Sequence, residues 1–196
     1  MKYLISLLLV VTLFACKNTG DQNSEEISEE KTTYTLKKEV NNEFEDPEDG
    51  GMMLLGSINR KGLETAPYNE WFTENKASHT LDTVVLDSIT PLLNNVKIKV
   101  FMGTWCEDSQ REVPALYKIL DAAGYDYSNF NTVAVSHDKE TPNGLEKGHH
   151  IDYVPTIIFT KNGDTLNRIV EYAHQTLEKD ILTILQEKPY SPAYSE

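Results

Sequence analysis

The order of the predicted strands and helices over residues 96–188 constrains the fold more than any other feature of the sequence. Residues 96–103, VKIKVFMG, alternate lysines with apolar and β-branched residues, which predicts a strand. Residues 107–123 predict a helix that ends before Gly124, and residues 130–138 predict a second strand. A strand, a helix and a strand in this order indicate a βαβ unit.

A hairpin and a further helix follow this unit. Residues 155–172, PTIIFTKNGDTLNRIVEY, predict two antiparallel strands joined at Asn162-Gly163. Residues 176–188 predict an amphipathic helix, because their leucines and isoleucines share one face. The sequence therefore predicts an α/β fold of three layers, in which a central mixed β-sheet is flanked by helices on both faces.

Residues 1–16, MKYLISLLLVVTLFAC, have the composition of an export signal. Lys2 is followed by an apolar run that is shorter than the about 20 residues that a membrane-spanning helix needs. The last four residues, LFAC, resemble a bacterial lipobox. This resemblance implies cleavage before Cys16, acylation of its thiol and new amino terminus, and stable anchoring by several acyl chains. The alternative is an ordinary secretory signal that contains a cysteine.

The residue after Cys16 bears on the membrane that would hold such an anchor. Where a lipoprotein sorting rule is known, Asp at this position retains the protein in the inner membrane, whereas this chain has Lys17. We therefore expect a lipid-anchored protein of the cell envelope, on the periplasmic face of the outer membrane. The inner membrane and the cell surface remain the alternatives.

The chain between the signal and the domain is expected to be a tether. Residues 17–51 are polar, acidic and nearly free of aliphatic residues, which predicts a flexible segment. Within it, residues 34–40, YTLKKEV, form a candidate strand. The domain is then predicted to comprise residues 52–196, opening with a strand or an apolar turn at residues 52–58.

The charge of the chain excludes one class of partner. The 196 residues include 31 Asp and Glu against 18 Lys and Arg, for a formal net charge of −13. Nucleic-acid binding needs clustered basic side chains that contact phosphates, so we expect no nucleic-acid partner. The acidity instead indicates a soluble, self-repelling surface.

The two cysteines of the chain have different predicted fates. Lipidation would use Cys16, which leaves Cys106 as the one free thiol and permits no disulfide within the mature chain. Cys106 stands between a predicted strand and a predicted helix, with Trp105 before it. Backbone N–H groups and the dipole at a helix N-terminus favour the nucleophilic thiolate. Three residues on, where a redox dithiol places its second cysteine, is Ser109.

These features together resemble the thioredoxin-fold family. Trp105-Cys106 matches the active-site position of that family, and Pro114 matches the proline of its active-site helix. Residues 153–163, YVPTIIFTKNG, are similar to its segment [IV]-P-T-L-x-x-F-x-x-G. The resemblance spans about residues 95–188, and it is nearest to monothiol variants of the thiol-disulfide lipoproteins of Bacteroidetes, related to the TlpA and ResA type.

The resemblance implies a role for each matched residue. Cys106 is the expected nucleophile, and Pro155 is the expected cis-proline that faces it. The main chain at Val154 is expected to pair with an extended substrate segment, with Thr156 as the neighbouring substrate-binding position. Expected partners are protein or low-molecular-weight thiols and disulfides, and no cofactor is expected.

The departures from the family pattern limit the chemistry. With Ser109 in place of a resolving cysteine, a mixed disulfide on Cys106 needs an external thiol to resolve it. The Ser109 hydroxyl is expected to donate to the thiolate, whereas Glu107 and Asp108 disfavour a further negative charge. Val100 stands where thioredoxins carry a buried Asp for proton transfer. A complete dithiol cycle is excluded.

Histidines supply the remaining candidates. His149-His150 precede Pro155, but adjacent side chains diverge and no other ligand is suitably spaced, so no metal site is predicted. His137 and Asp138 raise the possibility of a Cys-His-Asp hydrolase. Three classes of function therefore stay open: a monothiol thioredoxin-like protein, a redox-inactive module that binds partners in the cis-proline groove, and a cysteine hydrolase.

Overall fold

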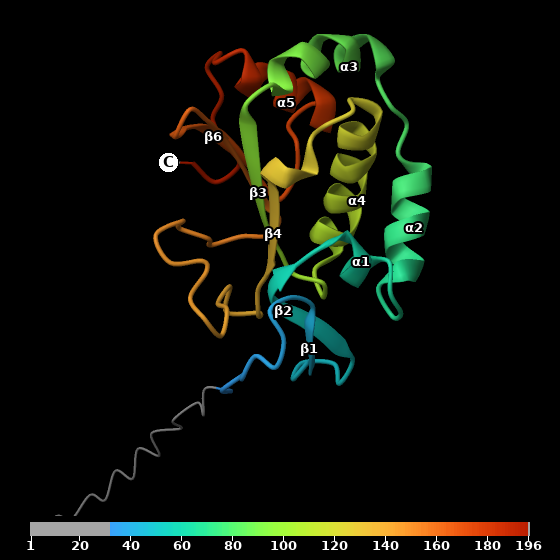
Figure 1. Ribbon diagram of the computed structural model, residues 1–196, viewed down its shortest axis with the longest axis vertical. Coiled ribbons are helices and arrows are strands. Elements are labelled where there is room, and N and C mark those ends of the chain that lie inside the picture. The colour runs from blue at the N-terminus through green and yellow to red at the C-terminus, as the bar shows by residue number, and fades with distance from the viewer. Residues whose placement is uncertain (1–31, 196) are drawn as a thin grey trace, which may run out of the picture. The chain divides into compact units, whose positions relative to one another are not determined.

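A central mixed β-sheet carries the candidate site in the computed structural model, which describes residues 32–195 (Figure 1). The strand β3 (Val96–Met102) runs parallel to β4 (Phe130–Ala134) and antiparallel to β5 (Thr156–Lys161). The strand β6 (Asp164–Val170) completes a hairpin with β5. The predicted βαβ and ββα units are confirmed, and this arrangement is a thioredoxin-like fold.

Two further strands extend the sheet at its other edge. The strands β1 (Asn42–Glu45) and β2 (Met52–Ile58) form an antiparallel hairpin, and β2 pairs antiparallel with β4. The order of the six strands is β1-β2-β4-β3-β5-β6. The predicted element at residues 52–58 is confirmed as the strand β2, whereas β1 adds a strand where the sequence predicted a flexible tether.

The hairpin corrects the predicted tether. Residues 34–40 form no strand, and β1 begins at Asn42, inside the stretch predicted to be flexible. The buried Asn42 side chain accepts hydrogen bonds from the backbone N–H groups of Lys37 and Lys38, which orders this polar segment through side-chain contacts. The compact unit begins at Thr33. The predicted signal, Cys16 and the tether up to residue 31 lie outside the described residues.

The helices gather on one face of the sheet. In Figure 1, α2 and α4 lie together on one side of the central strands. The main core on this side contains Val100 of β3, Phe72 of α2, Leu116 of α4 and Ile181 of α5, all essentially inaccessible to solvent. The helices are α1 (Arg60–Leu63), α2 (Asn69–Ser78), α3 (Thr83–Ile89), α4 (Glu107–Ala122) and α5 (Leu177–Leu185), with 3-10 turns η1 (Thr90–Leu93) and η2 (Tyr127–Asn129).

The opposite face differs from the expectation of a second helical layer. A small second core lies there, formed by Phe101, Val133, Val135, Val154 and Ile158. Residues 135–155, drawn mainly in orange in Figure 1, cover it without forming a helix. This connection contains a Pro-Asn-Gly sequence and two glycines with positive φ, Gly144 and Gly148, which disfavour a continuous helix.

Two prolines lie in the helical segments. The helix α3 ends at Ile89 and continues as η1, which contains Pro91. Pro114 lies within α4, the helix that begins after Cys106.

None of the helices among residues 32–195 is both long and apolar enough to span a membrane.

Candidate functional site

Cys106 occupies the N-cap position of α4. Its backbone is extended, with φ −89° and ψ 123°, and its carbonyl oxygen accepts the N–H of Gln110 at 2.9 Å. Its own N–H donates to the carbonyl of Gly103 at 3.1 Å, which closes a tight loop after β3. The unpaired N–H groups of the first turn of α4 therefore lie next to the cysteine, where they favour a negative charge on sulfur.

The thiol faces the turn that precedes β5. Sγ of Cys106 is 3.2 Å from the carbonyl oxygen of Val154, to which it donates, and the side chain is half-buried. The peptide bond between Val154 and Pro155 is cis. The structure thus brings together the cysteine and the proline that the sequence placed 49 residues apart.

Several contacts hold this proline turn in place. Thr156 is buried, and its hydroxyl donates to the carbonyl of Tyr153 at 2.7 Å. The N–H of Glu171, just after β6, donates to the carbonyl of Pro155 at 2.7 Å. The ring of Tyr194, near the C-terminus, stacks on Tyr153 with the two ring centres 4.3 Å apart. The Thr156 side chain therefore shapes the turn from within.

The Ser109 side chain contacts the loop that precedes α4. Its side chain is fully buried, and Oγ accepts the backbone N–H of Gly103 at 3.2 Å. Among the hydrogen bonds of the described residues, this is the contact of Ser109, rather than the expected donation to the sulfur of Cys106. The serine therefore ties the first turn of α4 to the loop that leads into it.

Val100 lies in β3, at the position where a buried carboxyl group would be expected in a thioredoxin. Val100 is fully buried in the main core, so this position offers no group for proton transfer. Glu107 and Asp108 both lie in the first turn of α4. Arg111 donates to Asp108 at 2.6 Å and offsets part of its charge.

Trp105 is held tightly between two parts of the chain. Its indole N–H donates to the carbonyl of Val135 at 3.0 Å, and its ring stacks on His137 with centres 4.0 Å apart and planes 24° apart. A Cβ on Gly103 would lie 2.5 Å from Cε2 of the indole, so the ring needs a glycine at this position. Trp105 and Cys106 pack against the same second core.

His137 is not placed as the base of a hydrolase. Its Nε2 lies 2.9 Å from Oδ1 of Asp46, and its Nδ1 lies 3.1 Å from Oε1 of Glu48. Carboxylates of the N-terminal hairpin therefore occupy both ring nitrogens, and neither comes from Asp138. A hydrolytic base would need a nitrogen directed to the thiol.

His149 and His150 also serve contacts within the fold. Nε2 of His149 lies 3.1 Å from Nζ of Lys99, and burial, with the charges of Lys99 and Arg168, lowers the pKa of His149. The carbonyl oxygens of His149 and His150 accept from Arg168 at 2.7 and 3.2 Å. Within residues 32–195, no group of three His, Cys, Asp or Glu side chains is arranged to hold a metal ion.

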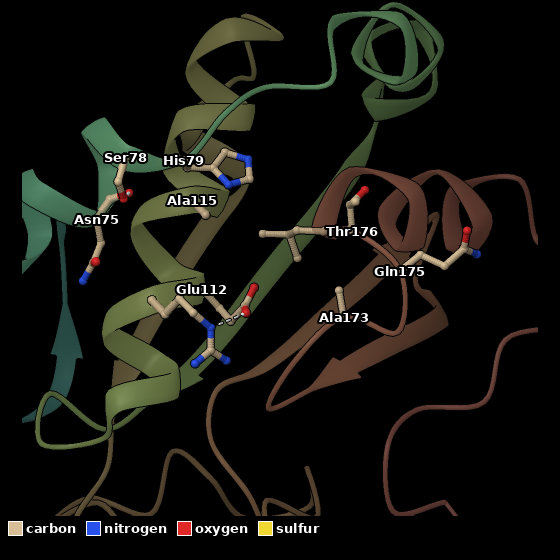
Figure 2. Close-up of a pocket in the computed structure, with 10 residues that line it drawn as sticks. Asn75, Ser78, His79, Glu112, Ala115, Ala173, Gln175 and Thr176 are labelled. Atoms are coloured by element: carbon tan, nitrogen blue, oxygen red, sulfur yellow. Dashed lines mark hydrogen bonds and ion pairs between the residues drawn. The ribbon is translucent and has the colours of Figure 1, made fainter.

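A cavity of about 250 Å³ lies beside the middle of α4. Burial raises the pKa of Glu112 in its wall, against the opposing effect of Arg111, which donates to it at 2.9 Å. This cavity could not be predicted from the sequence, because its lining comes from three separate segments. Figure 2 shows Asn75, Ser78 and His79 from the end of α2, Glu112 and Ala115 from α4, and Ala173, Gln175 and Thr176 from the segment before α5.

Comparisons with known proteins add a fold-level likeness. No family model matches the sequence, and no curated protein matches it. A protein of unknown function from Pseudomonas aeruginosa is similar in structure, with 16% identity, a TM-score of 0.48, and coverage of 62% of this chain and 86% of that one.

Two thioredoxin-related structures are weaker neighbours. The oxidized mitochondrial thioredoxin 3 of Saccharomyces cerevisiae has 24% identity, a TM-score of 0.30, and coverage of 49% of this chain and 86% of that one. A chain from a structure on thiol resolution in the yeast mitochondrial 1-Cys peroxiredoxin has 25% identity, a TM-score of 0.30, and coverage of 47% and 79%. These likenesses are too low to carry an argument about function, which rests on the geometry of the site.

Proposed function

We propose that this protein is a monothiol thioredoxin-like protein that exchanges thiols and disulfides through Cys106. The observation that carries the proposal is the position of Sγ, at the N-terminus of α4 and 3.2 Å from the carbonyl of Val154, next to a cis-proline. The only other cysteine of the sequence is Cys16, in the predicted lipobox, so no internal partner is expected to compete for Cys106.

The proposed reaction begins with the thiolate of Cys106. It attacks one sulfur of a substrate disulfide, which forms a bond between Cys106 and that sulfur and releases the other substrate sulfur as a thiolate. An external thiolate, of a protein or of low molecular weight, then attacks the substrate sulfur of this mixed disulfide. Cys106 leaves as the thiolate, and the substrate is now joined to the external thiol. The net result is an exchange of disulfide partners with no net oxidation.

In this scheme, the proton of the Cys106 thiol is transferred to water. In the described structure, the thiol donates to the carbonyl of Val154, and this hydrogen bond is lost when the proton leaves. Since Val100 supplies no buried carboxyl, the proton passes to water at the half-buried sulfur. The N–H groups at the start of α4 then stabilise the thiolate.

The substrate class follows from the main chain beside the sulfur. Val154 precedes the cis-proline, and an extended peptide that pairs with its main chain would present a disulfide to Cys106. Tyr153, 41% exposed, and Tyr172, also 41% exposed, offer apolar surface near the ends of β5 and β6. We therefore propose peptide segments that contain a disulfide as substrates, along with small disulfides.

A redox-inactive binding module is the second candidate. The observation that favours it is that the thiol is half-buried and already donates to Val154, while Ser109 is sealed in the interior. In that case, the cis-proline turn would bind an extended partner without covalent chemistry. The hydrolase is disfavoured, because both nitrogens of His137 face carboxylates.

Capture and release of a peptide disulfide distinguish these functions. The full-length Cys16→Ser variant, kept in detergent, has Cys106 as its one cysteine. After incubation with a disulfide-linked peptide dimer, we expect the intact mass to show one peptide attached, and added glutathione to release it. The Cys106→Ser variant should carry no peptide. Peptide binding without a covalent adduct would favour the binding module and contradict the exchange reaction.

The proposal includes a lipid anchor at Cys16 in the cell envelope, on the periplasmic face of the outer membrane. It is supported by the apolar run before Cys16 and by the residues LFAC. We expect the wild-type protein to incorporate labelled palmitate and to fractionate with membranes, and the Cys16→Ala variant to lose both properties. Unlabelled wild-type protein, or a variant that stays in the membrane fraction, would contradict the anchor.

A further inference from the structure

We infer that His137 is a positioning residue for Cys106, which it reaches through the ring of Trp105, and that Asp46 and Glu48 of the N-terminal hairpin hold it in place. The inference rests on the proposed function, since it concerns the placement of the reactive thiol. It assigns a purpose to β1 and to the turn that follows it, which lie before the predicted domain.

The carboxylates hold the imidazole from both of its nitrogens. Both oxygens of the Asp46 carboxylate lie about the same distance from Nε2 of His137, at 2.9 and 3.0 Å, and Glu48 contacts Nδ1 at 3.1 Å. Asp46 is almost completely buried, whereas Glu48 is exposed. Because both edges of the ring are held, rotation of the imidazole would break at least one contact.

Asp46 is itself fixed by the turn that joins β1 to β2. Its backbone N–H donates to the carbonyl of Gly51 at 2.8 Å, and its own carbonyl accepts the N–H of Gly50 at 2.9 Å. Its side chain also accepts the N–H of Glu48 at 3.0 Å. The carboxylate is therefore part of the folded hairpin, and His137 is docked on a rigid group.

Trp105 transmits this placement to the loop before α4. The imidazole stacks on the indole at 4.0 Å, while Lys139 lies over the same ring at 5.6 Å and donates to the carbonyl of His137 at 2.7 Å. Trp105 is followed directly by Cys106, whose N–H donates to the carbonyl of Gly103 and closes the loop. A shift of the indole would therefore shift the backbone that carries the thiol.

A second contact from the same hairpin reaches this loop directly. The N–H of Leu54, in β2, donates to Oγ1 of Thr104 at 3.0 Å, and both residues are buried. The carbonyl of Thr104 in turn accepts from the side chain of Gln110, in α4, at 2.8 Å. The hairpin thus holds the loop between β3 and α4 directly at Thr104 and, through His137, at Trp105.

A second histidine in the fold serves as a matched control. His79 lies 2.8 Å from the buried carboxylate of Glu178, and the two histidine side chains have similar exposure, 20% for His79 and 23% for His137. The recorded ring contacts of Trp105 do not involve His79. A purely structural effect of losing a histidine–carboxylate pair should therefore appear in both, whereas an effect on Cys106 should follow His137 alone.

The test compares the rate of alkylation of Cys106 by iodoacetamide in the full-length Cys16→Ser protein. We expect His137→Gln to slow alkylation roughly threefold or more, because loss of the ring pair moves the thiol from its place at the helix N-terminus. His137→Phe, which keeps a ring against Trp105, should restore the rate to within about twofold of that of the parent. His79→Gln should leave the rate unchanged.

Trp105 fluorescence reports on the ring contact through which His137 is inferred to act on Cys106. In a Trp71→Phe background, Trp105 is the one tryptophan, and we expect His137→Gln to shift its emission to the red while His79→Gln does not. Equal effects of His137→Gln and His79→Gln on the alkylation rate, or an unchanged rate in His137→Gln, would overturn the inference. Alkylation needs no disulfide substrate, so a wild-type protein that forms no mixed disulfide would contradict the proposed function alone.

Discussion

The substitution Gly103→Ala tests the account of the loop before α4. A methyl group at this position would lie 2.5 Å from Cε2 of Trp105 and 2.8 Å from Nε1 and Cζ2, closer than carbon atoms approach in proteins. The strand β3 ends at Met102, and the atoms nearest to the added methyl group belong to the Trp105 side chain. The indole is therefore the group that must move. We expect the ring to leave its place between Gly103 and His137.

The cost follows from the contacts that the displaced indole loses. Its stacking on His137 is worth about 0.5–1.5 kcal/mol, and its hydrogen bond to Val135 is worth about 0.5–1.5 kcal/mol. The free energy of unfolding should therefore fall by about 1–3 kcal/mol, which is also the range for overpacking a well-filled site. For a domain of this size, the melting temperature should fall by about 2–4 °C for each kcal/mol lost.

Urea unfolding of the Gly103→Ala protein, followed by circular dichroism, measures this loss. Gly51→Ala is the matched control, since its added methyl would meet the flexible carboxylate of Asp49, at 2.9 Å, rather than a fixed ring. We expect that control to stay within about 0.5 kcal/mol of the wild type. If the Gly103→Ala protein has the free energy of unfolding of the wild type and unchanged Trp105 emission, the prediction that the added methyl group displaces the indole is wrong.

Two further predictions concern the hairpin segment and the cavity. Asn42→Ala removes the acceptor of the N–H groups of Lys37 and Lys38 and should cost about 1–3 kcal/mol in urea unfolding; a loss below about 0.5 kcal/mol would contradict the ordered segment. Burial raises the pKa of Glu112, so the stability that its protonated form confers is present below the ordinary value near 4.5 and is lost as pH rises through the raised value. Relative to wild type, Glu112→Gln should therefore gain stability as the pH rises above the ordinary value near 4.5, and a difference that stays constant with pH would contradict this.

The strands and helices near the site could be predicted because their signals are local. The alternation in β3, the turn at Asn162-Gly163 and the apolar face of α5 each depend on residues close together in the sequence. The predicted cis bond before Pro155 is present, and the structure places it against the thiol of Cys106. These features follow from short patterns that tertiary contacts did not override.

The contacts that the sequence did not predict are of two kinds, some between distant segments and some between side chains and nearby backbone N–H groups. Composition marked residues 42–45 as part of a tether, yet β1 forms because β2 offers a partner strand and Asn42 satisfies neighbouring N–H groups. The pairing of His137 with Asp46 spans 91 residues, so no local pattern could reveal it. The hydroxyl oxygen of Ser109 accepts the N–H of Gly103, a contact that depends on the geometry of the loop before α4.

The irregular layer on the second face of the sheet also could not be predicted from local sequence patterns. The sequence predicted helices on both faces of the sheet, but residues 135–155 cover Phe101 and Val133 with irregular chain. Burial of apolar side chains such as Leu145 and Ile151 is enough to hold this segment on the sheet. A pattern of single apolar residues between glycines and prolines carries no periodicity from which that arrangement could be predicted.

The most direct test of the central claim compares the reactivity of Cys106 in the folded and unfolded protein. The full-length Cys16→Ser protein is exposed to glutathione disulfide at neutral pH, with and without urea, and the mixed disulfide is followed by intact mass. If the N-terminus of α4 and the turn at Val154 prepare the thiol for exchange, the adduct forms faster in the folded protein than in the unfolded chain. Slower formation in the folded protein, or an adduct that appears only in urea, would contradict the account.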